Sequence, residues 1–148
     1  MKKLILGIII ALLSVGVQAQ KVKPVQYGGT CQYQATVDQA SRVYTIRVTG
    51  YGKKDAQCRE DAEVRVLRMV LYTGIDGKSA PLLKQETSAL DDFIDNKQYK
   101  DYIQNVVSQG PLTKDKGAKS NKMTFDITIR INALDSYLRN NGYKKFGF

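Results

Sequence analysis

The chain has 148 residues, of which 43% are hydrophobic and 25% are charged, a balance that is typical of one globular domain and excludes a largely disordered chain. Its formal net charge is +9, and it contains no histidine. The absence of histidine excludes Ser-His-Asp and Cys-His nucleophilic sites and metal sites built on imidazole. We therefore expect no catalytic residue, no metal and no cofactor.

Residues 1–19 have the pattern of a secretory signal. Lys2 and Lys3 precede an apolar run over residues 4–13, and Val17-Gln18-Ala19 supplies a small-residue cleavage site. We expect cleavage after Ala19 and a protein that is periplasmic or associated with the cell surface. A retained membrane anchor is the alternative, although a membrane span needs about 20 apolar residues. No cysteine stands at the cleavage point to carry a lipid.

Export also changes which partners the basic charge can attract. Removing Lys2 and Lys3 lowers the formal net charge from +9 to +7, so the mature chain is still basic. Outside the cytoplasm the available polyanions are lipopolysaccharide, cell-wall polymers and acidic proteins, and we expect no nucleic-acid partner. A basic surface that serves only solubility is the alternative.

Two cysteines, Cys31 and Cys58, remain after cleavage. An even number of cysteines in an exported chain permits one disulfide, which would add about 3 kcal/mol of stability in the loop-entropy model. Two separately buried thiols are the alternative, because both positions fall on apolar faces.

Residues 20–30 show no hydrophobic periodicity and predict an extended leader before a single domain over residues 31–148. Two alternating segments open this domain, at 31–38 and at 42–49, and predict an antiparallel hairpin. In the second strand, Tyr44, Ile46 and Val48 are expected to face inward.

A long helix is expected to follow, from Asp55 to Thr73. Gly50 and Gly52 predict a sharp turn out of the strand, Asp55 predicts the helix cap, and Gly74 predicts a left-handed end.

Helical spacing gives this helix two apolar sides and predicts that its C-terminal half packs against the sheet and against a second element. Arg59, Glu60 and Glu63 in the first half are expected to lie in water. The two apolar sides consist of Ala56, Val64, Leu67 and Leu71, and of Cys58, Ala62, Val66, Met69 and Val70. A polar strip of Asp61, Arg65 and Arg68 lies between them, and Asp61 is expected to pair with Arg65 at i,i+4.

The middle of the chain predicts only short elements. A turn at 76–81 precedes short helical pieces at 82–83 and 89–94, the second of which we expect Ser88 to cap. Another helical turn at 96–103 is expected to lead into a strand over 103–108.

A polar, basic loop over 110–122 leads into a second hairpin strand at 123–131, which has the cleanest alternation in the chain. A helix is expected to begin at Asn132 and to end at Gly142, and residues 143–148 could add a short edge strand. The elements together predict an α+β fold in which an antiparallel sheet of two hairpins packs on one long central helix, with a shorter C-terminal helix.

Basic residues supply the candidate binding surface. The turn at Gly50-Tyr51-Gly52-Lys53-Lys54 could hold an anion on helix amides, but its spacing matches no phosphate-binding pattern, and a structural turn is the alternative. The acidic clusters at 60–63 and 91–92 are neighbours on short segments and do not face each other as glycosidase carboxylates do. The candidate surface comprises Lys53, Lys54, Arg65, Arg68, Lys114, Lys116, Lys119 and Lys122.

Two segments carry a resemblance to a known group of proteins. They are the strand Thr45 to Gly52 with Ala56, Ala62 and the helix end Leu71 to Ile75, and the strand Ile127 to Asn132 with Leu134, Leu138 and Gly142. They resemble the N-terminal region of flagellar assembly protein T and the related small Helicobacter-type lipoproteins. The resemblance implies a compact α+β domain that acts as a part of cell-envelope assemblies without enzymatic activity.

We therefore expect an exported, non-enzymatic structural or adaptor module that binds protein through a sheet edge or through the basic loop. The alternative is an exported binding protein for an anionic ligand, lipopolysaccharide or a cell-wall polymer, held by the loop lysines.

Overall fold

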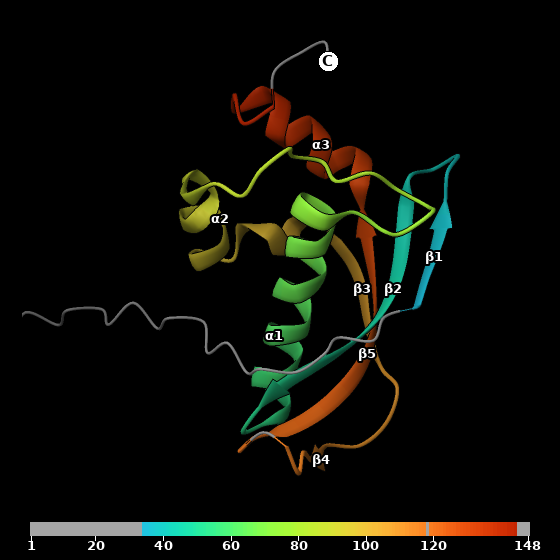
Figure 1. The fold of residues 1–148 in the computed structure, drawn as a ribbon, viewed down its shortest axis with the longest axis vertical. Helices are drawn as coiled ribbons and strands as arrows, with labels where there is room; N and C mark the ends of the chain where they lie inside the picture. The colour runs from blue at the N-terminus through green and yellow to red at the C-terminus, as the bar shows by residue number, and fades with distance from the viewer. Residues whose placement is uncertain (1–33, 118, 145–148) are drawn as a thin grey trace, which may run out of the picture.

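The structure is a computed structural model that describes residues 34–117 and 119–144. The predicted signal sequence, the leader, Cys31 and the end of the tail lie outside the described residues. Within them the fold is α+β, as predicted: an antiparallel sheet carries one long helix on one face, and a shorter helix ends the domain (Figure 1).

Within the described residues the sheet has five strands, and its main path runs in the order β1-β2-β5-β3. The two predicted hairpins, β1–β2 and β3–β5, meet where β2 and β5 pair, from Val43 opposite Arg130 to Gly52 opposite Asn121. The short β4 pairs with the start of β5. The strands are β1 (Gln34–Asp38), β2 (Val43–Gly52), β3 (Ile103–Ser108), β4 (Thr113–Lys114) and β5 (Asn121–Arg130).

The two faces of the sheet differ in polarity because side chains alternate along each strand. Six inward side chains of the central strands are buried, and Met123 is partly buried against the same core: the buried ones are Tyr44, Ile46, Val48, Phe125, Ile127 and Ile129. The outward side chains form bonded cross-strand pairs, Thr45–Thr128, Arg47–Asp126 and Thr49–Thr124. The long helix packs on the apolar inward face.

Gly50 and Gly52 do not form the predicted turn, because β2 continues through Gly52. The helix lies so close to this strand that a Cβ atom on Gly50 would fall 1.9 Å from the carbonyl oxygen of Cys58 and 2.8 Å from the Cβ of Ala62. The glycines therefore allow a strand and a helix to touch through their backbones, a use that a turn-based interpretation of the sequence misses.

Helix α1 (Asp55–Arg68) continues as a π-helical turn, η1 (Met69–Thr73), and stops at Gly74, which confirms the predicted position of the helix end. Gly74 has a positive φ of 76°, but its ψ of −172° differs from the predicted left-handed helical conformation. The predicted cap is wrong, because Lys54 occupies the N-cap position and no side chain caps the helix there. The side-chain oxygen of Gln57 instead accepts a hydrogen bond from the backbone N–H of Lys53 at 2.9 Å.

The π-turn redirects two carbonyl groups to the chain that follows it. The N–H of Leu82 donates to the carbonyl of Val70 at 3.1 Å, and the N–H of Leu83 donates to the carbonyl of Leu71 at 2.8 Å. The returning segment is thus fixed to the end of the helix.

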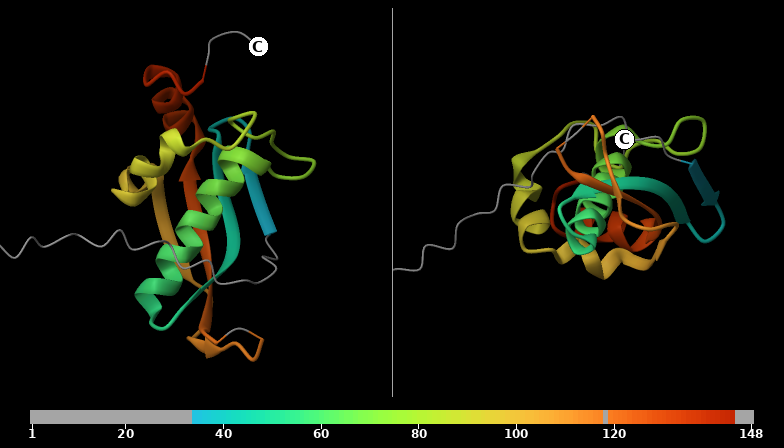
Figure 2. Two further views of the ribbon diagram at one scale, coloured as in Figure 1. Left: turned by 60° about the vertical axis from the view of Figure 1, so that its left-hand side comes forward. Right: turned by 90° about the horizontal axis from the view of Figure 1, so that it is seen from below.

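The predicted packing of α1 on two sides is confirmed. One side lies on the sheet, and the segment of η2 (Ser88–Leu90), α2 (Asp91–Asp95) and η3 (Gln98–Tyr102) packs against another (Figure 2). Leu90 and Phe93 of this segment join the same core as Leu67 and Leu71 of the helix region. Ala56, which was expected on an apolar side, is exposed because it belongs to the first turn.

Two details of the segment before α2 and of the C-terminal helix differ from expectation. Thr87, not Ser88, caps η2, its hydroxyl oxygen accepting from the N–H of Ala89 at 3.2 Å. Helix α3 (Ile131–Asn140) follows β5 without a loop, so Ile131 starts the helix rather than ending the strand. Gly142, with a φ of 76°, follows the last residue of α3, Asn140, so the helix ends near the predicted position. No helix in residues 34–117 and 119–144 is long and apolar enough to cross a membrane.

Candidate binding site

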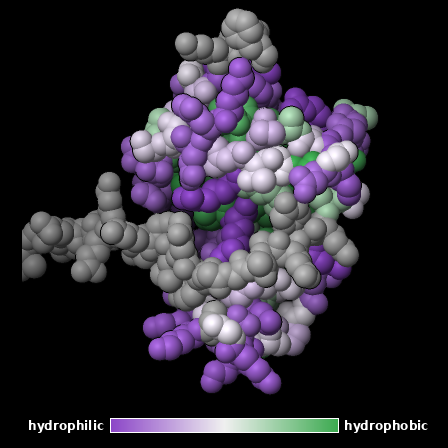
Figure 3. All heavy atoms as spheres, in the orientation of Figure 1, coloured by the Kyte–Doolittle hydropathy of each residue, from purple (hydrophilic) through white to green (hydrophobic). Residues whose placement is uncertain are grey.

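The structure gathers all six predicted lysines at one end of the sheet, which we call the basic end: Lys53, Lys54, Lys114, Lys116, Lys119 and Lys122. Gly52 of β2 pairs with Asn121 of β5, which pairs with Lys114 of β4, so the end of β2 lies beside the basic loop. The side-chain amide of Asn121 also donates to the carbonyl of Lys53 at 3.0 Å. Hydrophilic side chains project from this end in Figure 3.

Within the basic end, Lys122 forms an ion pair with Asp115. Its ammonium lies 3.3 Å from a carboxylate oxygen of Asp115, and its side chain is 42% exposed. Lys53, Lys54, Lys114, Lys116 and Lys119 are exposed. This end therefore presents a mostly solvated group of cations.

Arg65 and Arg68 do not belong to this group, because both lie further along α1 and each pairs with a carboxylate. Arg65 donates to Asp61 at 2.7 Å, which confirms the predicted i,i+4 pair, and its guanidinium lies 5.1 Å from the centre of the Tyr51 ring. Asp61 also accepts from the N–H of Tyr51 at 2.8 Å. Arg68 pairs with Glu86 at 3.0 Å. These contacts connect α1 to Tyr51 and Glu86, and a place for the two arginines in a binding surface stays a prediction.

Glu63 is the residue that the sequence interpretation missed. It was expected in water, but it is 2% exposed because η3 covers this side of α1. One carboxylate oxygen accepts from Nε of Arg59 at 2.9 Å. The other lies 3.4 Å from the ammonium of Lys100 and accepts from the hydroxyl of Tyr99 at 3.4 Å. Burial, and then the charge of Glu63, raises the pKa of Tyr99, so its hydroxyl stays protonated as a donor.

One signal in the sequence could have placed Glu63 correctly. Val66, Leu67 and Val70 follow it at i+3, i+4 and i+7, and all three are buried. These positions share one face of a helix with Glu63. Arg59 at i−4 supplies the counter-charge that a carboxylate on such a face requires.

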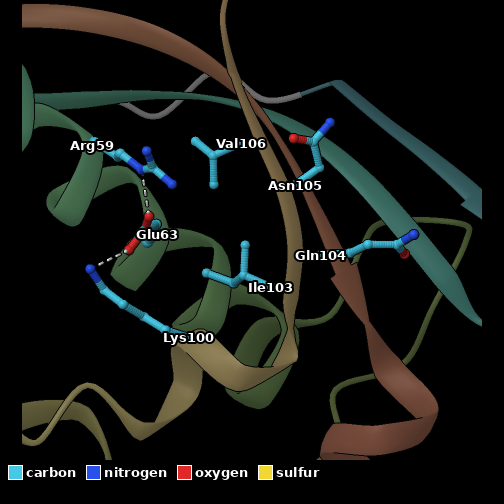
Figure 4. Close-up of a pocket in the computed structure, with 7 residues that line it drawn as sticks. All are labelled: Arg59, Glu63, Lys100, Ile103, Gln104, Asn105 and Val106. Carbon is cyan, nitrogen blue, oxygen red and sulfur yellow. Dashed lines mark hydrogen bonds and ion pairs between the residues drawn. The ribbon is translucent and has the colours of Figure 1, made fainter.

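A pocket of about 220 Å³ lies beside this group, between α1 and the start of β3 (Figure 4). Ile103 and Val106 extend toward the charged group, whereas Gln104 and Asn105 point away from it. The pocket is lined by Arg59, Glu63, Lys100, Ile103, Gln104, Asn105 and Val106.

The charges in the pocket leave unused donors. Both oxygens of Glu63 are engaged, but Arg59 uses only Nε for it and its side chain is 55% exposed. The side chain of Lys100 is 45% exposed. Two cations thus face one buried carboxylate, and the terminal guanidinium nitrogens of Arg59 are directed to no partner in the part of the chain that the structure describes.

Strand β3 also presents an open edge. It pairs with β5 on one side, and no other described strand pairs with it. The N–H of Gln109 donates to the carbonyl of Thr124 at 2.8 Å, and hydrogen-bonding positions alternate along an antiparallel strand. The backbone N–H and C=O of Val106 and Ser108 therefore point outward, away from β5. A register shift between Ile103 and Asn105 leaves the rest of β3 regular.

The two edges of the sheet are protected differently. At β1, the ammonium of Lys78 donates to the carbonyl of Ala35, and the side chain of Gln39 donates to the carbonyl of Lys78 at 2.8 Å. β3 has no charged residue and no proline, and its Val107 is 45% exposed. Because lysine, proline and covering loops are what keep sheet edges from pairing, β3 is the edge that is open to another strand.

Cys58 is a free thiol that is completely buried, with its sulfur 3.7 Å from the carbonyl oxygen of Asn121. Burial raises the pKa of this thiol, and the charges of Asp55 and Asp61 add to the effect. Its predicted disulfide partner, Cys31, lies outside the described residues, so the bond stays a prediction. The alternative of a buried thiol describes Cys58 as the structure has it.

Two further results bear on function. No group of three or more His, Cys, Asp or Glu side chains suited to a metal occurs within residues 34–117 and 119–144. Comparisons of the chain with protein-family models, curated proteins and solved structures found no match.

Proposed function

We propose that the mature chain is an exported, non-enzymatic adaptor of a bacterial cell-envelope assembly and that it binds another protein through the open edge of β3. The observation that supports this proposal is the combination of outward backbone groups at Val106 and Ser108 with the lack of any protecting residue in the strand. A partner strand would extend the sheet order β1-β2-β5-β3 by one. Export rests on the signal pattern of residues 1–19.

Strand addition is a common way to recognise an extended peptide, because main-chain hydrogen bonds supply affinity and alternate side chains supply specificity. Covering Val107 would add apolar contact, since this valine is exposed now. The resemblance to flagellar assembly protein T and the small lipoproteins favours the same class of role and stays a prediction.

The test is capture of partners from the envelope of the source cell by the mature chain in about 0.5 M salt, where the Debye length is under ~5 Å. We expect Val106→Pro to lose the captured protein, because proline removes the outward N–H while the bonds to β5 remain. Val106→Ala is the matched control, because it shortens the side chain and keeps the N–H. Equal capture by Val106→Pro and the wild type would contradict binding at β3.

A second candidate function is favoured by the basic end. Its six lysines lie on residues 53–55 and 113–122, near β4. These two segments contain two carboxylates, Asp55 and Asp115. An anionic envelope polymer such as lipopolysaccharide is the ligand that this end would hold. In that case binding disappears in 0.5 M salt and in a Lys114→Gln, Lys116→Gln, Lys119→Gln variant, and Val106→Pro has no effect.

A further inference from the structure

We infer that the partner strand carries an acidic side chain, aspartate or glutamate, that enters the pocket between α1 and β3 and pairs with Arg59 and Lys100. The inference rests on the proposed addition of a strand at β3 and names the chemistry of that partner.

The position of the pocket supports it first. The side chain of Val106 lies on the inward face of the sheet, opposite Ile127, and it lines the pocket. A strand added beside β3 would direct every second side chain to this same face. Those side chains would reach the space bounded by Arg59, Glu63 and Lys100 (Figure 4).

The charge of the pocket supports it second. Glu63 accepts hydrogen bonds from Arg59 and Tyr99 and forms an ion pair with Lys100, so both of its oxygens are engaged and it has little capacity for a further donor. Arg59 and Lys100 are both partly exposed and retain donors that Glu63 does not use. A guanidinium binds a carboxylate through two parallel hydrogen bonds, and a neighbouring ammonium strengthens the pair. A carboxylate is therefore the group that completes this pocket.

The sequence argues against the chain filling its own pocket. Residues 20–33, which lie outside the described part, include Lys21 and Lys23 and contain neither aspartate nor glutamate. The strand β3 of a second copy, Ile103–Ser108, has no carboxylate either. A segment of another protein that carries an acidic residue is the occupant that the charges fit.

The first measurement uses synthetic octapeptides of alternating threonine and valine, with glutamate or glutamine at one inward position. We expect the glutamate peptide to bind the mature wild-type chain about five- to tenfold more tightly than the glutamine peptide, because each of the two partly exposed ion pairs contributes modestly. Isothermal titration at low and at moderate salt gives both dissociation constants. Peptides that bind equally, or neither binding at millimolar concentration, would overturn the inference.

Two variants should change this preference in opposite directions. Arg59→Gln is expected to bring the two peptides to nearly equal affinity, because it removes the bidentate donor. Glu63→Gln is expected to increase the affinity for the glutamate peptide, because it removes the carboxylate that competes for the same cations. A purely structural role for this group would lower the affinity for both peptides in both variants. The Lys114→Gln variant removes one positive charge away from the pocket, as Arg59→Gln does within it, so it is the charge-matched control and should keep the preference.

Stability and oligomeric state complete the test. Thermal unfolding shows whether each variant is folded, and if Arg59→Gln is not, the Arg59→Gln, Glu63→Gln, Lys100→Gln triple variant removes all three charges together and should also bind the two peptides equally. Concentration-dependent dimerisation that Val106→Pro abolishes would overturn the inference in favour of a second copy. If the wild-type chain binds both peptides equally and Val106→Pro binds neither, strand addition at β3 stands and the proposed acidic side chain in the pocket is overturned. Envelope capture unchanged by Val106→Pro would overturn the proposed function as well.

Discussion

Asp135 shows how one buried carboxylate can fix a helix to the sheet. Its side chain is 7% exposed and receives Lys144 at 2.7 Å, Arg139 at 3.1 Å and Arg42 at 3.6 Å. Burial alone would raise the pKa of Asp135, but the hydrogen bonds from Lys144 and Arg139 outweigh it and the net pKa is lowered. Arg42 comes from the β1–β2 turn, so the carboxylate ties α3 to the first hairpin.

The lowered pKa predicts a specific pH dependence. A carboxyl group with a folded pKa below its unfolded value, about 3.9, stabilises the protein fully above that value and loses the effect as pH falls through the folded pKa. We expect Asp135→Asn to cost about 2 kcal/mol at pH 7 and progressively less below pH ~4. Urea unfolding at pH 7, 4 and 2.5 measures this difference.

Asp126→Asn is the comparison for a surface pair. Asp126 is 23% exposed and its partner Arg47 is 44% exposed, so its loss should cost only about 0.5 kcal/mol at pH 7. An Asp135→Asn cost that does not change with pH would contradict the assigned role of this carboxylate.

At the scale of elements, β2 and α1 approach each other through their backbones at Gly50. We expect Gly50→Ala to destabilise the protein by about 3 kcal/mol or more, because its Cβ would meet the backbone carbonyl of Cys58 at 1.9 Å. Gly110→Ala is the control, since no atom lies within 4 Å of its added Cβ, and it should change stability by less than about 0.5 kcal/mol. Urea unfolding of both variants checks the prediction, and a well-tolerated Gly50→Ala would contradict the close packing.

The elements that could be predicted are those with a clear period. The alternation at 42–49 and 123–131 predicted β2 and β5, and helical spacing predicted α1 with its end at Gly74. The role of Gly50, which allows β2 to touch the backbone of α1, could not be predicted, because a glycine in a turn and a glycine packed under a helix look alike in sequence. The same limit applies to Glu63, whose burial depends on η3, a segment 35 or more residues away along the chain.

The candidate site shows a similar division. Composition predicted a basic surface, and chain order did not reveal that Lys53 and Lys114 lie at the same end of the sheet, because this placement arises from the pairing of both β2 and β4 with β5. Whether a strand lies at an open edge also depends on the order of the whole sheet. The structure groups the six predicted lysines at the basic end and places Arg65 and Arg68 apart from them in ion pairs, and the role of all eight residues as a binding surface stays a prediction.

At the scale of the whole molecule, the two candidate functions use different parts of the surface. The basic end lies at the tip of β2 and β4, whereas the open edge and its pocket lie along β3 beside α1 (Figures 1 and 4). Binding through the basic end depends on charge attraction that salt screens, whereas binding through the edge of β3 depends on backbone hydrogen bonds. Salt and the Val106→Pro variant therefore separate them.

Amide hydrogen exchange at β3 tests the central claim most directly. In the free mature protein, the N–H groups of Val106 and Ser108 should exchange quickly because they point away from β5, whereas those of Asn105 and Val107 should be protected by it. Binding of the captured partner, or of the glutamate octapeptide, is expected to slow exchange at Val106 and Ser108 by at least about tenfold. Exchange at these two amides that stays unchanged in the complex would contradict strand addition at β3.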